Sequence, residues 1–319
     1  MRPDVPVVFV HVHYPDVWAE MALELAAAFD RPFGLVLTCR DAAMSLAAVE
    51  SPHLAFQRRL TVENRGRDVL PFTAALRDLG PSFTIGLKLH TKRSVHREDG
   101  EGWRRYLTGS LLERGDGTGP KALDLMEREP AIGLIAPRAH LLPLQGRIVL
   151  NAWIIRRMIR LMGMPLTMPD LETRRFAAGS MFWFRREALT HFENPDLPGL
   201  FAPEKGQLDG TAAHGAERLF AAVVELEGFA ATAAEAVDSI AKAAGEGSLS
   251  KAEIDAVSDA TIDDAANPFI LPMARFWRRH PYALIAAHQL YTRSPKPVWR
   301  LARRLLKHFT VDREPAGRG

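Results

Sequence analysis

The stretch NRGRDVLPFTAALRDLGPSFTIGLKLHTK, residues 64–92, decides the fold class. It opens with a short polar loop that holds one glycine. An apolar pattern with helical spacing follows over Val69–Leu79, and a strand-like run over residues 83–89 ends in His-Thr-Lys. A glycine between a strand and a helix lets the backbone approach a ligand closely. This order of segments predicts part of a βαβ arrangement in a parallel sheet.

The same alternation of strands and helices extends to both sides of this stretch. Strands are expected over residues 7–13, 32–38, 59–63, 83–89, 131–136 and 178–184. Helices are expected from Asp16, over residues 42–49, 69–79 and 103–112, around Leu123 and Met126, over 152–162, from Arg186, and over 215–226. The pattern predicts an α/β fold with a mainly parallel, Rossmann-type sheet flanked by helices.

Composition limits the classes of protein to which the chain can belong. The 319 residues are 47% hydrophobic and 25% charged, which is typical of a globular protein. The one cysteine, Cys39, excludes an intramolecular disulfide framework and fits a reducing compartment. The sequence has no signal-peptide core and no run of ~18 apolar residues, so we expect a cytoplasmic protein.

Charge is distributed unevenly along the chain. The formal net charge is +3, but residues 275–319 hold 11 Lys or Arg and 2 Asp or Glu. The rest of the chain is therefore acidic on balance. A nucleic-acid-binding core is not expected, because a basic surface should then cover the domain itself.

A change in composition after Gly228 predicts two domains. Residues 1–230 are expected to form the α/β domain, and residues 231–319 a helical C-terminal extension. Residues 231–266 are rich in alanine and acidic, which suits a helical hairpin or a linker. Residues 298–309 predict a basic amphipathic helix that suits an anionic membrane surface, within a tail at 275–309. The alternatives are a helix packed on the domain and an interface with a partner.

Two polar clusters follow predicted strands and suit an anionic ligand. In the first, Asn64, Gly66, Arg67 and Asp68 precede a helix N-terminus, which attracts anions. The alternative is a helix start capped by Asp68 with its arginines in solvent. The second cluster holds His90, Thr91, Lys92 and Ser94, and it suits a diphosphate because ligands bind at the carboxyl ends of such strands. The alternative is a solvated loop.

Two further clusters could bind or react. His11 and His13 end the first predicted strand, where a base or ribose could bind; the alternative is a polar loop with Asp16 capping a helix. Thr211, His214 and Glu217 share one face of a predicted helix that Asp209 precedes. Carboxylates beside a histidine suit general-base or metal chemistry. The alternative is a surface helix with polar pairs.

These clusters, in this order, resemble the rhamnan synthesis protein F family of bacterial polysaccharide-assembly proteins. The resemblance covers about residues 5–230. Its motifs, together with Trp103, are VHVHYP at 10–15, NRGRDVLPF at 64–72, KLHTKRS at 88–94, IGLIAP at 132–137, AAGSMFWFR at 177–185 and DGTAAHGAER at 209–218. The resemblance implies a glycosyltransferase with a GT-A-like fold. The implied donor is a nucleotide sugar, dTDP-L-rhamnose. The implied acceptor is a glycan or a lipid-linked molecule.

The resemblance also implies roles for individual residues. Asp209 is expected to be the catalytic base, with Glu217 as the alternate, and Gly179, Ser180 and Trp183 are expected on the acceptor side. The remaining residues are expected to bind the donor: His11, His13, Asn64, Gly66, Arg67, Asp68, His90, Thr91, Lys92 and Ser94.

One departure from the GT-A pattern bears on the metal. His90-Thr91-Lys92 stands where an Asp-x-Asp motif would hold a divalent Mg²⁺ or Mn²⁺ ion. Lys92 could neutralise the diphosphate in its place. The alternative is a metal site of unusual composition that uses His90 or His214. A non-catalytic module that binds nucleotide sugars or glycans is the other expectation open for the whole chain.

Overall fold

The computed structural model describes residues 5–91, 100–203, 209–261 and 280–293. The chain divides into two compact units, Met1–Phe269 and Ile270–Gly319. In the second unit, helix α11 (Pro281–Arg293) is described, and it exposes Tyr282 and Leu290. The expected amphipathic helix at 298–309 lies outside the described residues.

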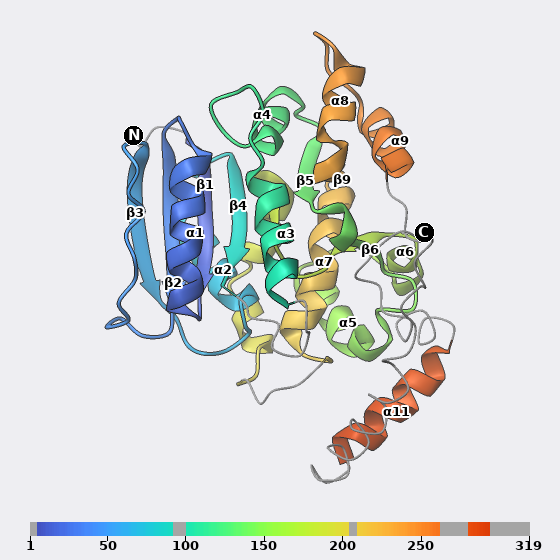
Figure 1. Ribbon diagram of the computed structural model, residues 1–319. Helices are drawn as coiled ribbons and strands as arrows, with labels where there is room; N and C mark the ends of the chain where they lie inside the picture. Colours follow the sequence, from blue (N-terminus) through green and yellow to red (C-terminus); the bar gives the residue numbers. More distant parts are fainter. Residues whose placement is uncertain (1–4, 92–99, 204–208, 262–279, 294–319) are drawn as a thin grey trace, which may run out of the picture. The chain divides into compact units, whose positions relative to one another are not determined.

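A seven-stranded sheet of order β3-β2-β1-β4-β8-β5-β9 forms the centre of the first unit (Figure 1). Its strands are β1 (Val7–Val12), β2 (Phe33–Cys39), β3 (Leu54–Thr61), β4 (Ile85–His90), β5 (Ile132–Ala136), β8 (Phe182–Arg185) and β9 (Ala230–Ala233). Strand β8 runs antiparallel to both neighbours, and the other pairs are parallel. The expected α/β fold with a mainly parallel sheet is confirmed. The short strands β6 (Leu141–Pro143) and β7 (Arg175–Ala177) form a separate ribbon.

Helices cover both faces of the sheet, because alternate residues of a strand point to opposite sides. On β1, Val8 and Val10 face one core, and Val7 and Phe9 face the other. The first core lies under α1 (Pro15–Ala28), α3 (Gly100–Leu112), α4 (Lys121–Arg128), α8 (Val237–Ala244) and α9 (Lys251–Thr261). The second lies under α2 (Val69–Leu79), α5 (Ala152–Leu161), α7 (Ala212–Leu226) and the 3-10 helix η3 (Arg186–Glu193).

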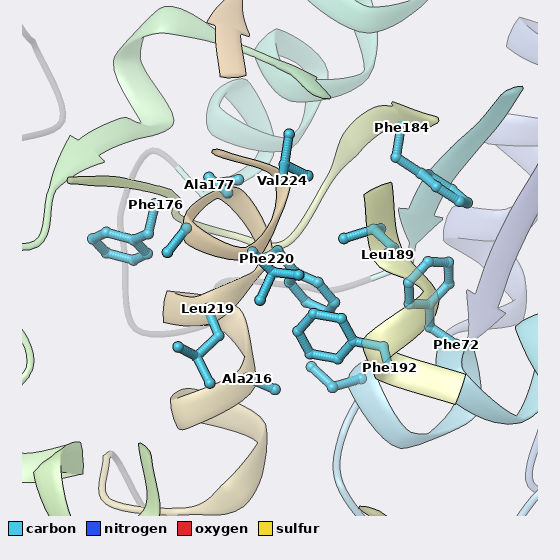
Figure 2. Close-up of a cluster of buried hydrophobic side chains, with 14 of the residues drawn as sticks. Phe72, Phe176, Ala177, Phe184, Leu189, Phe192, Ala216, Leu219, Phe220 and Val224 are labelled. Carbon is cyan, nitrogen blue, oxygen red and sulfur yellow. The ribbon is translucent and has the colours of Figure 1, made fainter. Parts of the chain in front are cut away.

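Aromatic rings fix α2 and α7 on the second face of the sheet (Figure 2). The rings of Phe72 on α2 and Phe184 on β8 meet edge to face, with centroids 5.3 Å apart. The rings of Phe192 and Phe220 lie 4.4 Å apart, which joins η3 to α7. Such pairs bury large apolar areas in a defined geometry. The rigid packing holds the N-terminal ends of α2 and α7 near the same edge of the sheet.

The helix expected over residues 42–49 is wrong. This segment has no regular secondary structure, because side chains from elsewhere take up its carbonyl oxygens. Trp18 Nε1 donates to the carbonyl of Ala47, and Arg59 Nη2 donates to the carbonyls of Asp41 and Met44. These tertiary hydrogen bonds override the helix propensity of alanine.

The structure moves the expected domain boundary from residue 230 to Phe269. Strand β9 pairs with β5 inside the main sheet, so residues after 230 complete the first unit. Over its described part the segment 231–266 is not a linker, because it holds two consecutive helices that contact each other, in keeping with the expected helical hairpin. It contains the end of β9, the 3-10 turn η5 (Ala234–Ala236), α8 and α9.

Candidate functional site

A cavity of about 410 Å³ opens at the carboxyl ends of β1 and β4. The chain leaves β1 through α1 to β2 on one side, and it reaches β4 on the other side through α2. Such a switch point is where open α/β sheets bind ligands. The lining residues are His11, His13, Tyr14, Asn64, Arg67, Asp68, Val69, His90, Thr91, Gly179, Ser180, Ala213, His214 and Glu217. The structure therefore brings together most of the residues predicted from the sequence.

Thr91 organises the loop that follows β1. Its side chain is fully buried, and its hydroxyl oxygen accepts hydrogen bonds from the backbone N–H groups of His13 and Tyr14, at 2.9 and 3.0 Å. The Thr91 N–H donates to the carbonyl of His11 at 3.0 Å. Thr91 thus positions two lining residues.

The histidines of the pocket are held in specific orientations. His11 Nδ1 lies 3.0 Å from the hydroxyl of Thr38, and burial lowers the pKa of His11 to about 4, although the nearby Asp68 raises it. Burial and the charge of Arg40 also lower the pKa of His13. The nearly buried His90 donates from Nε2 to the carbonyl of Gly179 at 2.7 Å. The neutral imidazoles of His11 and His13 can bind the hydroxyl groups of a ligand.

Lys88 lies directly behind the cavity and was missed in the sequence. Lys88 is only 1% exposed, and its ammonium group donates a hydrogen bond to Asp68 Oδ2 at 2.5 Å. It also donates to the carbonyl and the hydroxyl of Ser180, at 2.7 and 2.8 Å. The rings of Phe72, Phe182 and Phe220 surround the charge. Lys88 therefore ties the loop before α2 to the turn before β8.

The ion pair with Lys88 also determines the contacts of the Asp68 side chain. Asp68 occupies the N-cap position of α2, yet its side chain makes no capping hydrogen bond. Its carboxylate is instead directed to Lys88 and lines the cavity. The sequence alternative, in which Asp68 only caps the helix, is thus not what the structure shows.

Gly179 and Ser180 form a left-handed turn that presents backbone groups to the cavity. Their φ angles are 85° and 58°, and a positive φ is uncommon for serine. The N–H of Gly179 donates to Glu217 Oε1 at 2.6 Å. Glu217 Oε2 lies 3.5 Å from Arg218 Nη1. These two contacts hold Glu217, which lines the cavity, in a defined orientation. The turn also shortens the strand expected over 178–184, which begins at Phe182 as β8.

Asp209 does not line the cavity. Asn151 Nδ2 and Arg218 Nη2 donate to its two carboxylate oxygens, at 2.8 and 3.1 Å. His214, in contrast, lines the cavity, and its Nδ1 lies 2.8 Å from the Thr211 hydroxyl in a capping box at the start of α7. Of the two carboxylates that the sequence offered as a base, Glu217 lines the cavity and Asp209 does not.

Two other predicted residues also lie away from the cavity. The indole of Trp183 is fully buried in the core beneath α1 and donates to the carbonyl of Leu111, so its expected place on the acceptor side is wrong. Gly66 turns the backbone with a φ of 69° and packs against Phe201 and Leu70. Lys92 and Ser94 fall outside the described residues.

The described residues assemble no set of three His, Cys, Asp or Glu side chains that could hold a metal ion. The two histidines considered for such a site are engaged otherwise: His90 Nε2 with the Gly179 carbonyl, and His214 Nδ1 with Thr211. No helix in the described ranges is long and apolar enough to cross a membrane.

A family model described as rhamnan synthesis protein F matches residues 3–228 of the chain. An uncharacterised protein of Xanthomonas campestris pv. campestris, WxcX, is 36% identical over 247 residues, in each of two strains. The match covers 74% of this chain and 33% of WxcX, so the chain spans about a third of the relatives' length. Among solved structures, S. aureus TarS 1–349 aligns at 11% identity and a TM-score of 0.32, over 68% of this chain and 55% of that one.

Proposed function

Because the chain belongs to the rhamnan synthesis protein F family, we propose that it is a glycosyltransferase of polysaccharide synthesis. It moves a sugar from a nucleoside-diphosphate donor to a glycan or lipid-linked acceptor. L-Rhamnose carried by dTDP is the proposed donor sugar, in keeping with the family's name. The observation that carries the proposal is the cavity at the sheet's switch point, where Glu217 faces a cluster of hydroxyl-binding groups.

The proposed reaction joins an acceptor hydroxyl to the anomeric carbon of the donor. The hydroxyl oxygen attacks that carbon, the bond from the carbon to the diphosphate oxygen breaks, and the diphosphate leaves with the bonding electrons. Glu217 takes the proton of the hydroxyl as general base. Its place in the cavity, and the hydrogen bond that orients it, favour it over Asp209. A single base of this kind favours inversion at the anomeric carbon.

The leaving diphosphate needs positive charge and hydrogen-bond donors. Arg67 lines the cavity beside Asn64 and the start of α2, so we assign the diphosphate to this side. Lys92 is proposed from the sequence as a second cation. His11, His13 and His90 bind hydroxyl groups of the sugar or ribose. No step is assigned to a metal ion, because the described side chains offer no set of metal ligands.

The test compares two carboxylate variants of the purified chain with dTDP-L-rhamnose and an acceptor glycan. Glu217→Gln is expected to lower turnover by at least about 100-fold and to change donor affinity only a few-fold, since a general base contributes about that much. Asp209→Asn is expected to leave turnover within a few-fold. Full turnover by Glu217→Gln would contradict the assignment of the base.

A non-catalytic module that binds nucleotide sugars or glycans is the second candidate, favoured by His-Thr-Lys in the place of Asp-x-Asp. It predicts that a nucleotide sugar raises the melting temperature of the chain by mass action while no sugar is ever transferred. Turnover in the presence of EDTA would support the metal-free reaction.

A further inference from the structure

Helix α5 presents a stripe of basic and aromatic side chains to solvent. Trp153, Arg156, Arg157 and Arg160 follow one another at the three- and four-residue spacing that places side chains on one helix face. All four are exposed. The opposite face is buried and consists of Ile154, Ile155, Met158 and Ile159. We call the exposed stripe the α5 face.

Among the described residues, no carboxylate forms an ion pair with the arginines of the α5 face. Helix α5 holds no acidic residue. In the part of the chain that the structure describes, the three arginines make no ion pair, and Arg160 donates to the backbone carbonyl of Arg156. Other surface arginines do form ion pairs, as Arg31 does with Glu127 at 2.7 Å. The α5 face therefore keeps three uncompensated positive charges.

Trp153 adds an apolar anchor to this charge. It is 53% exposed, and Leu23 is the other large hydrophobic residue of the first unit with such exposure in the described ranges. An indole combines a large apolar area with one N–H group, which suits the boundary between lipid headgroups and acyl chains. Arginine binds phosphate oxygens with two parallel hydrogen bonds. The α5 face thus combines the two elements by which surface helices bind lipid.

We propose that the α5 face docks on an anionic membrane surface. The three arginines contact lipid phosphates, and Trp153 enters the headgroup region, with the helix axis lying along the membrane. The complementary charge is what selects an anionic bilayer over a neutral one. This proposal is independent of the basic tail at 275–319, because it uses α5 alone.

Docking through α5 would bring the cavity close to the membrane. The buried face of α5 packs on the first turns of α7, where a side chain added at Gly215 would meet Ile154 and Met158. Gly215 lies between His214 and Glu217, which both line the cavity. Packed helix axes lie about 8–10 Å apart, so α5 and the first turns of α7 separate the docked surface from the cavity.

A fluorescent label at position 153 tests contact directly in the full chain. Trp153→Cys, carrying the environment-sensitive fluorophore NBD, replaces one ring system with another, and the buried Cys39 is changed to Ala in all variants. The matched control carries the label at Leu23→Cys, on α1 over the other face of the sheet. Vesicles of phosphatidylcholine with phosphatidylglycerol should shift the emission of label 153 to the blue and leave label 23 unchanged. No shift at 153, or equal shifts at both positions, overturns the proposal.

Removal of the three positive charges from the α5 face tests the electrostatic part of the proposal. The triple variant Arg156→Gln, Arg157→Gln, Arg160→Gln should bind these vesicles at least about tenfold more weakly, given the contribution of each arginine near an anionic surface. The control removes the same charge from the other layer, through Arg114→Gln, Arg128→Gln and Lys242→Gln, and should bind like the unchanged chain. Equal binding by both triple variants assigns attachment to other parts of the chain and overturns the proposal.

One further arm completes the test. Polyglutamate in place of vesicles should produce no shift at label 153, and a shift as large as that with vesicles would assign the face to an acidic protein and overturn the lipid proposal. Vesicle binding is measured without donor or acceptor. It can therefore fail while sugar transfer in solution persists, and it can succeed where transfer fails.

Discussion

Lys88 carries the clearest expectation for stability at the scale of single residues. Its three ammonium N–H groups have acceptors on Asp68 and Ser180, and its side chain is 2% exposed. Removing one partner of a buried pair leaves the other charge uncompensated. We expect Lys88→Met to lower the free energy of unfolding by about 3 kcal/mol, as measured by urea titration.

The exposed pair of Arg58 and Asp78 provides the control for Lys88. Its atoms are 2.6 Å apart, but its side chains are 35% and 37% exposed. Solvent screens such a pair, so Arg58→Met should cost less than about 1 kcal/mol. Equal losses for the two variants would show that Lys88 is not the buried tie inferred from its contacts.

His11 makes stability depend on pH. Its folded pKa of about 4 lies below the usual 6.5 because of burial, so the unfolded chain binds more protons between these values. Stability is therefore lost as pH falls from 6.5 towards 4. Between pH 7 and 5 the unchanged chain should lose about 2 kcal/mol more than His11→Asn in urea titrations. Parallel losses in the two chains would count against a neutral His11.

The residue scale also shows what the sequence can and cannot predict. His11, His90 and Glu217 were predicted because polar residues at strand ends and along one helix face follow simple spacing rules. Lys88 was missed because a lysine in an apolar strand gives no sign of its partners, which lie 20 and 92 positions away. Trp183 was misplaced because strand alternation does not say which face of the sheet carries the site.

At the scale of elements, the predictions that succeeded were those for which the local sequence pattern was sufficient. Helix α2 was predicted at Val69–Leu79, and the structure has the same bounds. The segment at 42–49 failed because the bonds that hold it come from Trp18 and Arg59, which no local rule contains. The antiparallel direction of β8 likewise depends on the whole sheet.

The loop before α2 gives the element-scale prediction. A side-chain carbon at Gly66 would lie 2.5 Å from Phe201 and 2.6 Å from Leu70, at a φ of 69°. Gly66→Ala combines left-handed strain with overpacking, so we expect a loss of about 3 kcal/mol in thermal or urea unfolding. Gly163→Ala has a φ of 66° but open space, and should cost only about 1 kcal/mol. Similar costs at both positions would mean that the loop relaxes freely.

At the scale of the whole molecule, the sequence and the structure place the end of the first unit at different residues. The sequence placed a boundary at residue 230 from a change in composition. Composition, however, indicates which segments are exposed to solvent or act as linkers, and it does not indicate which strands pair. Strand β9 covers the edge of β5, and Ala236, Ile240 and Ile254 are fully buried in the core under α1. Glu235 also accepts hydrogen bonds from Tyr106 and from the backbone of Arg138.

Two shortened chains distinguish these accounts. A chain of residues 1–230 loses most of β9 together with α8 and α9, which exposes apolar core and an unpaired strand edge. We expect it to aggregate or to unfold without a cooperative transition. A chain of residues 1–269 keeps the whole first unit, so its melting temperature should stay within a few degrees of the full chain, measured by circular dichroism. Cooperative melting of the 1–230 chain would restore the boundary predicted from composition, with β9 only an addition to a finished sheet.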